Sequence, residues 1–147
     1  MQEQIELFRV HRQQQEKLVY YIVALCVTSI GFSIYQTTGH SLKWIQVPLA
    51  LAVLSWGLSI YCGLRFLKYA LSILYANNAL FNICQGIEPG VGNHPQQIKA
   101  ASSGVEEAIK QSAETSNKLF KWQERLFYSG IVLFLFWHLL EMRASSL

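Results

Sequence analysis

The sequence predicts an all-α membrane protein built from three long helices, each with a transmembrane part and a cytoplasmic extension. Of its 147 residues, 52% are hydrophobic and 14% are charged, whereas about a quarter of the residues of a soluble domain are charged. Three apolar runs, at 18–36, 44–64 and 126–142, alternate with polar segments. Each is close to the length that crosses a hydrocarbon core about 30 Å thick. We therefore expect a single membrane domain, 1–147, whose cytoplasmic extensions form a helical stalk or vestibule.

The first helix is predicted over 2–37. Gln, Glu and Arg dominate residues 2–17, and neither Pro nor Gly separates them from the first apolar run. These residues are good helix formers, so we expect one continuous helix. Tyr20, Tyr21 and Tyr35 lie near the two ends of the span, where aromatic rings prefer the membrane interface. No small-residue cleavage site follows a short apolar core, so no cleavable signal is expected.

The second helix is predicted over 41–85, and it continues past the end of its span. The span at 44–64 has no charged residue, and the cytoplasmic part at 65–85 follows without Pro or Gly. An apolar 4–3 pattern, which is typical of coiled coils, runs through both parts. This predicted seam comprises Gly57, Ile60, Leu64, Leu67, Leu71, Leu74, Asn78 and Phe81. Asn78 either sets the register of an oligomer or faces solvent near the helix end.

Two short connections join the helices. In the first, Gly39 can end one helix and Ser41 can cap the next, as these residue types commonly do. The turn at 86–95 is rich in Gly and Pro. Asn93 is placed to cap the third helix there, and Pro95 suits its first turn, because proline is well tolerated at that position.

The third helix is predicted over 96–142, with a cytoplasmic part at 96–125 and a span at 126–142. Its last apolar run is short for a span, but Arg125 and Arg143 flank it and can extend to the interface. An interfacial helix is the alternative, against which the all-round hydrophobicity of the run argues. Its weak seam comprises Ile98, Ala101, Val105, Ala108, Ser112, Thr115, Leu119, Trp122 and Leu126.

The distribution of basic residues predicts the orientation in the membrane. Seven of the twelve Lys and Arg residues lie between Arg65 and Arg125, and three precede the first span. By the positive-inside rule, the N-terminus and the 65–125 segment are cytoplasmic and the C-terminus lies outside. We expect a multi-pass protein of a bacterial inner (plasma) membrane.

The sequence contains no phosphate-binding loop, nucleophile elbow or metal-binding spacing, and it has no Asp. The predicted topology distributes His11, His40, His94 and His138 over both sides of the membrane, so they cannot form one metal site. We therefore expect no enzyme, no catalytic residues, no metal and no cofactor. His138 precedes Glu141 by three residues, and an interfacial hydrogen bond is the favoured role of this pair over a functional one.

Small and polar residues recur at helical spacing inside two of the spans. The pore-lining candidates are Ser29, Ser33 and Gln36 in the first helix and Ser55 and Ser59 in the second. Such rows also serve helix packing, which is favoured for the second helix, while both roles stay open for the first. The absence of charge from the spans argues against a proton pump or an ion-coupled transporter.

Basic residues gather where the predicted spans meet the cytoplasm. They are Lys17, Arg65, Lys68, Lys118, Lys121 and Arg125. The favoured interpretation is a positive-inside belt of basic residues that meets anionic lipid headgroups. The sharper hypothesis is a basic ring in a symmetric oligomer, which would bind a nucleotide or a single-stranded oligonucleotide or select anions.

A lone copy would leave apolar side chains of its cytoplasmic part exposed to water, so we predict a symmetric homo-oligomer. The residues concerned are Leu71, Leu74, Phe81, Leu119 and Phe120. A membrane oligomer with a cytoplasmic vestibule suggests a gated ion channel or pore. The alternative is a non-channel scaffold or accessory subunit whose stalk docks a partner protein, and a holin-like lesion former is a third possibility.

The layout resembles that of small transmembrane effectors of bacterial antiviral defence, in particular the membrane channel effectors of the Hailong system. The local features that carry this resemblance are RFLKYALSILYANNALF after the second span and EPGVGNHP at the hairpin tip. The resemblance implies a tetrameric channel held closed by a single-stranded oligo-deoxyadenylate, which a partner nucleotidyltransferase makes. It further implies that loss of the ligand opens the channel and depolarises the cell. The basic residues around Arg65 and Lys121 would then contact the ligand.

Overall fold

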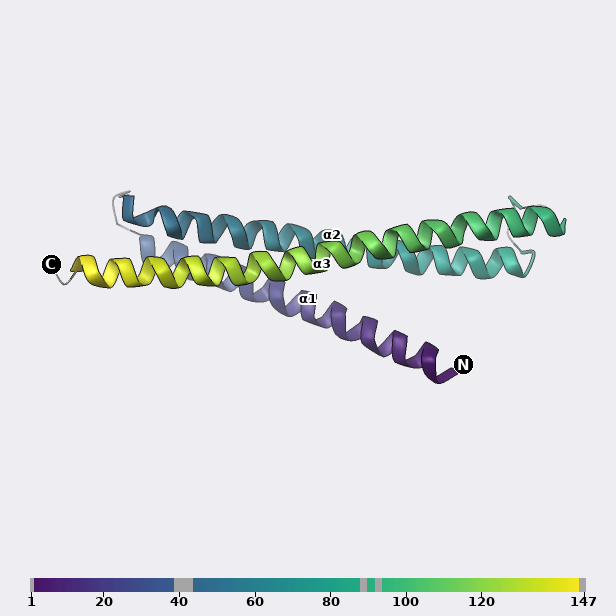
Figure 1. The fold of residues 1–147 in the computed structure, drawn as a ribbon, viewed down its shortest axis with the longest axis horizontal. Helices are drawn as coiled ribbons and strands as arrows, with labels where there is room; N and C mark the ends of the chain where they lie inside the picture. Colours follow the sequence, from purple (N-terminus) through teal and green to yellow (C-terminus); the bar gives the residue numbers. More distant parts are fainter. Residues whose placement is uncertain (1, 39–43, 88–89, 92–93, 146–147) are drawn as a thin grey trace. The chain divides into compact units, whose positions relative to one another are not determined.

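The computed structural model describes residues 2–38, 44–87, 90–91 and 94–145, and within these ranges the side chains from Val10 to Ala144. Its elements are α1 (Gln2–Thr37), a short 3-10 helix η1 (Trp44–Gln46), α2 (Val47–Cys84) and α3 (Pro95–Ser145) (Figure 1). Over the described residues the chain is helical, and no strand occurs. The expected caps Gly39, Ser41 and Asn93 lie outside the described residues.

The helix ends follow from local sequence. Pro48 is the second residue of α2 and Pro95 is the first of α3, where a missing backbone N–H leaves no helical hydrogen bond unmade. Gly86, two residues after the end of α2, adopts a φ of 69°. There the Gly86 N–H donates to the Ile83 carbonyl and the Ile87 N–H to that of Asn82, both at 3.0 Å. This pair of backbone hydrogen bonds, together with a glycine in the left-handed conformation, ends the helix.

The chain divides into two compact units. Unit 1 comprises Met1–Leu64 and Phe120–Leu147, and unit 2 comprises Arg65–Leu119. The three predicted spans all belong to unit 1. Within the described residues, three helices are long and apolar enough to cross a membrane. The predicted fold class is thus confirmed, and the protein is an all-α membrane protein.

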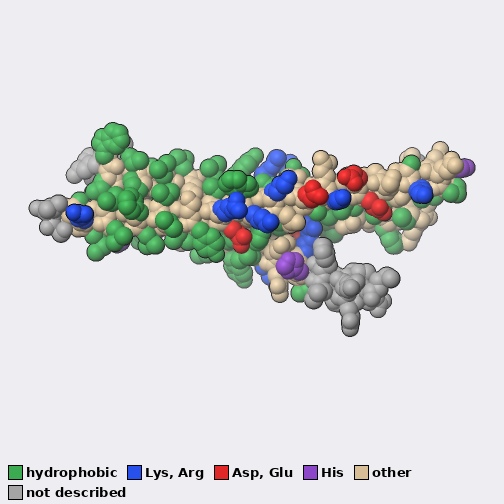
Figure 2. Space-filling view, viewed as in Figure 1, with side chains coloured by type: hydrophobic (Ala, Val, Ile, Leu, Met, Phe, Trp, Pro, Cys, Tyr) green, Lys and Arg blue, Asp and Glu red, His purple; other side chains and the backbone are tan. Residues whose placement is uncertain are grey.

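Unit 1 packs α1, the start of α2 and the end of α3 side by side (Figure 1). Its core contains Ile22 and Cys26 from α1 and Trp56 from α2, with Phe134 of α3 packed against them. The Trp56 and Phe134 rings lie 5.8 Å apart. A Cβ at Gly130 would overlap the Trp56 indole, so only glycine lets α3 approach at this level. The outer surface of these segments is densely apolar (Figure 2), as contact with lipid requires.

The face that α2 buries is one residue out of phase with the predicted seam. Gly57 and Leu64 of that seam are exposed, as are Leu71, Leu74 and Phe81. The buried positions keep the 4–3 spacing and are Ser59, Gly63, Phe66, Ala70 and Ile73. The small residues of this row decide the phase, because they allow a neighbouring helix to approach closely.

The weak seam predicted for α3 needs a similar correction. Ala108 and Trp122 are exposed, whereas most other members of the predicted seam are half-buried. The buried positions of α3 recur every seven residues and are Ser116, Gln123, Gly130 and Trp137. The seven-residue spacing of the predicted seam was therefore correct. The buried face of α3, however, is formed by residues that the predicted seam did not include.

Unit 2 is a helical hairpin with one covered face. Phe66, Ala70, Ile73 and Ile83 of α2 are buried within it. Leu71, Leu74 and Phe81, which were expected to be exposed, are 51%, 65% and 59% exposed. The same expectation was wrong for Leu119 in this unit and for Phe120 in unit 1, because both side chains are half-buried.

Candidate functional site

A polar cluster lies inside the apolar core of unit 1, centred on Gln123. This side chain is fully buried, and its Nε2 donates a long hydrogen bond of 3.4 Å to the Val19 carbonyl of α1. The Ser59 hydroxyl of α2 donates to the Gln123 carbonyl at 2.9 Å, and the Ser55 hydroxyl donates to the Leu126 carbonyl at 2.7 Å. The cluster therefore connects all three helices by hydrogen bonds.

The sequence builds this cluster from small residues on α2. A Cβ at Gly63 would lie 2.5 Å from Gln123 Nε2, so glycine is required where the amide enters the core. The Gln123 Oε1 atom is buried and has no hydrogen-bond partner among the described residues. An unpaired buried oxygen lowers the free energy of unfolding by about 1–3 kcal/mol. The polar cluster therefore does not have the hydrogen bonding that would give the greatest stability.

The structure places the five pore-lining candidates in helix contacts or at their margins. Ser55 and Ser59 hold α2 against α3 through the two hydrogen bonds above. Ser33 is buried and donates to the Ser29 carbonyl at 2.8 Å, while Ser29 and Gln36 are half-buried. These positions correspond to helix packing within one copy. A role for any of the five in a pore stays a prediction.

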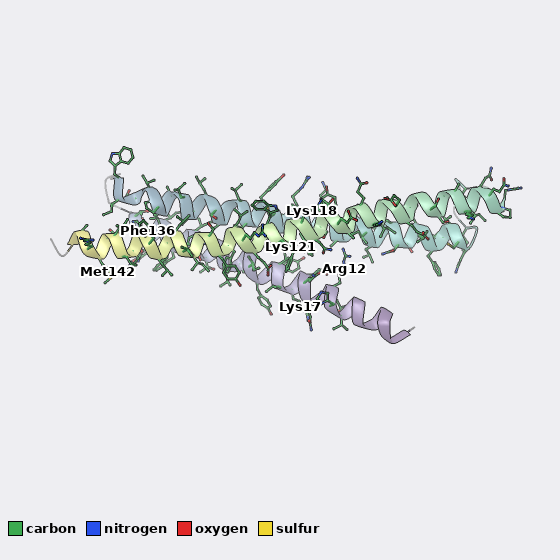
Figure 3. All side chains as sticks on the ribbon, viewed as in Figure 1. Arg12, Lys17, Lys118, Lys121, Phe136 and Met142 are labelled. Atoms are coloured by element: carbon green, nitrogen blue, oxygen red, sulfur yellow. The ribbon has the colours of Figure 1, made fainter. Side chains whose placement is uncertain are left out.

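The six predicted ligand-binding residues are exposed, and each unit carries three of them. Lys17, Lys121 and Arg125 belong to unit 1, and Arg65, Lys68 and Lys118 to unit 2. Lys17 extends from α1, and Lys118 and Lys121 extend from α3 (Figure 3). The Arg125 guanidinium lies 5.9 Å from the centroid of the Trp122 ring, and that of Arg65 lies 5.8 Å from the Tyr69 ring. Both cations are therefore held near aromatic faces.

Arg12 is a basic residue of unit 1 that the sequence reasoning missed. Its side chain is half-buried, and its Nη2 atom is buried without a hydrogen-bond partner among the described residues. It extends from α1 near Lys17 (Figure 3). Arg12 lies seven residues before the buried Val19, so continuing the buried face of α1 backward would have found it.

The described histidines do not form a buried site. His11, His94 and His138 are exposed, and His40 lies outside the described residues. No group of three or more His, Cys, Asp or Glu side chains in the described part of the chain is arranged to hold a metal ion. His138 and Glu141, together with Gln36, Trp137 and Met142, line a small cavity of about 240 Å³ at the end of unit 1.

A larger cavity of about 540 Å³ lies between α1 and the η1–α2 segment of unit 1. Eight residues line it: Ser33, Ile34, Thr37, Gln46, Leu49, Ala50, Val53 and Leu54. This cavity was not foreseen from the sequence. One of the pore-lining candidates, Ser33, is part of its wall.

These features define a class: a small helical membrane protein with three candidate spans and, between the second and third of them in the sequence, a helical hairpin. No protein family, curated protein or solved structure matches the chain. A functional assignment therefore has to come from the surfaces and sites of this chain.

Proposed function

We propose that the protein is a homo-oligomeric transmembrane effector that forms a gated ion channel. The observation that carries this proposal is the uncovered face of α2 in unit 2, where Leu71, Leu74 and Phe81 are each more than half exposed. All three predicted spans belong to unit 1, so in this proposal the side chains of unit 2 meet water rather than lipid. Full burial of each would contribute about 1.5–3 kcal/mol. A symmetric assembly would supply that burial.

A second copy of the chain is the occupant that this face favours. The exposed positions follow the 4–3 spacing of the predicted seam, and Asn78 lies exposed within it. In a parallel homomeric bundle the Asn78 side chains of all copies would lie at one level, where they could hydrogen-bond to one another and fix the register. The resemblance noted for the layout favours a tetramer.

The span part of α2 supports a gated pore rather than a permanently open one. Its exposed face carries Gly57, Tyr61 and Leu64 and has no charge. If α2 helices from several copies surround an axis, Leu64 narrows the path with an apolar ring. Such a ring excludes water until the helices move apart, which is gating by dewetting.

The gating ligand that we propose is an anionic nucleotide or oligonucleotide, bound by exposed basic residues of each unit. These are Lys17, Lys121 and Arg125 in unit 1 and Arg65, Lys68 and Lys118 in unit 2. In keeping with the resemblance, a partner nucleotidyltransferase would make the ligand. Its loss would open the channel in a bacterial inner membrane, and the fall in membrane potential would limit viral growth. In this proposal the protein is not an enzyme.

The second candidate function is that of a non-channel scaffold, and it rests on the same exposed face. A helix of a different protein could cover Leu71, Leu74 and Phe81 in place of a second copy. The two candidates differ in oligomeric state and in ion conductance, so one preparation of protein distinguishes them.

The test is ion flux from liposomes that contain the purified protein, with and without single-stranded oligo-deoxyadenylate. We expect flux that the oligonucleotide suppresses, and an oligomer by light scattering in mild detergent. Replacing Lys17, Lys121 and Arg125 with Gln should abolish the suppression, whereas the control Lys99→Gln, also at an exposed lysine, should retain it. No flux under any condition contradicts the channel, and a monomer in several detergents contradicts the assembly.

A further inference from the structure

The 540 Å³ cavity of unit 1 is a groove with a closed floor and open sides. Ser33 of α1 and Leu49 of α2 are buried and form its floor, at 1% and 5% exposure. Ile34 and Leu54 border it and are strongly exposed. A groove of this size is in the range of small-molecule sites, which are mostly apolar with a few polar groups.

The polarity of the groove changes along its length. Thr37 ends α1 and Gln46 directly precedes α2, so both polar residues lie at the end of the bundle where these helices are joined. Val53 and Leu54 lie about two turns further along α2 at helical rise. The polar end of the groove therefore coincides with the end of the spans, and its apolar end lies within them.

The aromatic residue beside the groove is consistent with a membrane interface at its polar end. Trp44, the first residue of η1, is 92% exposed. An exposed tryptophan at the end of a span is typical of the headgroup region. The groove thus begins at the interface and extends into the hydrocarbon layer.

The polar end offers hydrogen bonds of both kinds without a formal charge. The Thr37 hydroxyl donates to the carbonyls of Ser33 and Ile34 at 3.0 and 3.1 Å, so its oxygen remains available as an acceptor. The half-buried Gln46 side chain shows no hydrogen bond to another described residue, and its amide can both donate and accept. The residues that line the groove include no Lys, Arg, Asp or Glu among those described.

We propose that this groove is a binding site for one acyl chain of a membrane glycerolipid. The chain lies along Leu49, Val53 and Leu54, and the glycerol-ester region lies at Thr37 and Gln46. The ester carbonyl accepts from the Gln46 amide, and the neutral lining selects an ester or hydroxyl head over a free carboxylate. Ser33 then contacts lipid instead of a water path. This proposal does not depend on channel activity.

The first test measures lipid retention by native mass spectrometry after detergent exchange. The wild-type protein is loaded with a diacyl glycerolipid, a lysolipid or a free fatty acid of equal chain length. We expect one glycerolipid or lysolipid per protomer and at least about tenfold less fatty acid, since a tenfold difference corresponds to about 1.4 kcal/mol. Equal retention of the fatty acid, or of detergent alone, overturns the assignment of the ester region.

A matched pair of variants locates the site. Ala50→Phe fills the groove from an exposed position in its wall, and Ala24→Phe adds the same side chain at an exposed position of α1 outside it. Ala50→Phe should lower lipid retention by about tenfold, and Ala24→Phe should leave it unchanged. Equal retention by both variants overturns the proposal.

A second measurement keeps the proposal testable if Ala50→Phe does not fold. A glycerolipid with a photoreactive group on its acyl chain is cross-linked to the wild-type protein in liposomes, and the modified peptides are sequenced. Labelling should concentrate at 33–37 and 49–54. Labelling spread evenly over lipid-facing residues such as Leu58, Val132 and Leu135, which are more than half exposed, overturns it.

Discussion

At the scale of single residues, the helix packing of unit 1 depends on two glycines. Gly63 and Gly130 leave room for the Gln123 amide and the Trp56 indole, respectively. Ser55 and Ser59 then reach backbone carbonyls of α3. In a lipid environment such close packing replaces the hydrophobic effect as the source of helix association.

Gly63→Ala should destabilise the protein by about 1–3 kcal/mol, because the new methyl group overlaps the Gln123 amide and the core must shift. The measurement is the midpoint of unfolding in a denaturing-detergent titration. Gly31→Ala is the control, since no atom lies within 4 Å of a Cβ at that position. It should be neutral or stabilising by up to about 1 kcal/mol. Equal effects of the two changes would show that the contact is not needed.

At the scale of elements, α2 has two apolar faces with different tasks. The face containing Ser59, Gly63 and Phe66 is buried within the chain. The neighbouring face, which is one residue out of phase and contains Leu71 and Leu74, is exposed in unit 2. A helix with apolar residues on both faces is stable in water only when both are covered, and this is why we assign the second face to another copy.

Leu74→Glu should weaken self-association by at least about tenfold per interface, because a charge would enter an apolar contact. Ser72→Glu adds the same charge at an exposed position of α2 outside the predicted seam, and it should leave association unchanged. Analytical ultracentrifugation in mild detergent gives the distribution of oligomers. If both variants sediment as the wild-type protein does, the exposed face is not the interface.

Leu64→Asn should increase resting ion flux, because a polar side chain would hydrate the proposed apolar constriction. The readout is flux from liposomes in the presence of the closing oligonucleotide. Leu58→Asn is the control, since Leu58 is similarly exposed on the same span but lies outside the predicted seam. A leak that is the same in both variants would argue against a constriction at Leu64.

At the scale of the whole molecule, a parallel assembly around α2 can be detected through a native cysteine. Cys84, the last residue of α2, is exposed, whereas Cys26 is buried and Cys62 is half-buried. Cys84 lies three residues after Phe81 of the exposed face. In a parallel bundle the Cys84 residues of neighbouring copies come to the same level, close to the seam.

Mild oxidation of membranes should therefore give a disulfide-linked dimer in a variant that retains Cys84 as its sole cysteine. Cys84→Ser should remove the dimer entirely, as seen by non-reducing electrophoresis. An antiparallel or unrelated arrangement would leave Cys84 reduced under the same conditions. Membrane-impermeant thiol reagents applied from each side would also test the predicted cytoplasmic position of this residue.

The sequence by itself determined that the chain is helical and that three of its helices are long and apolar enough to suit a membrane. Hydropathy, helix propensity and the positions of Pro and Gly act locally, so they can be read residue by residue. This is why Pro95 begins α3 and why α2 continues past Arg65.

Only the tertiary structure decided which face of each helix is buried. A one-residue difference in phase rotates a helix face by about 100°, and an apolar pattern on both faces cannot settle it. The small row at Ser55, Ser59 and Gly63 was visible in the sequence, but its role depends on α3 approaching there. The burial of Gln123 follows from that approach, and the groove at Ser33 follows from the packing of α1 beside α2. Both require side chains from separate segments to meet in space.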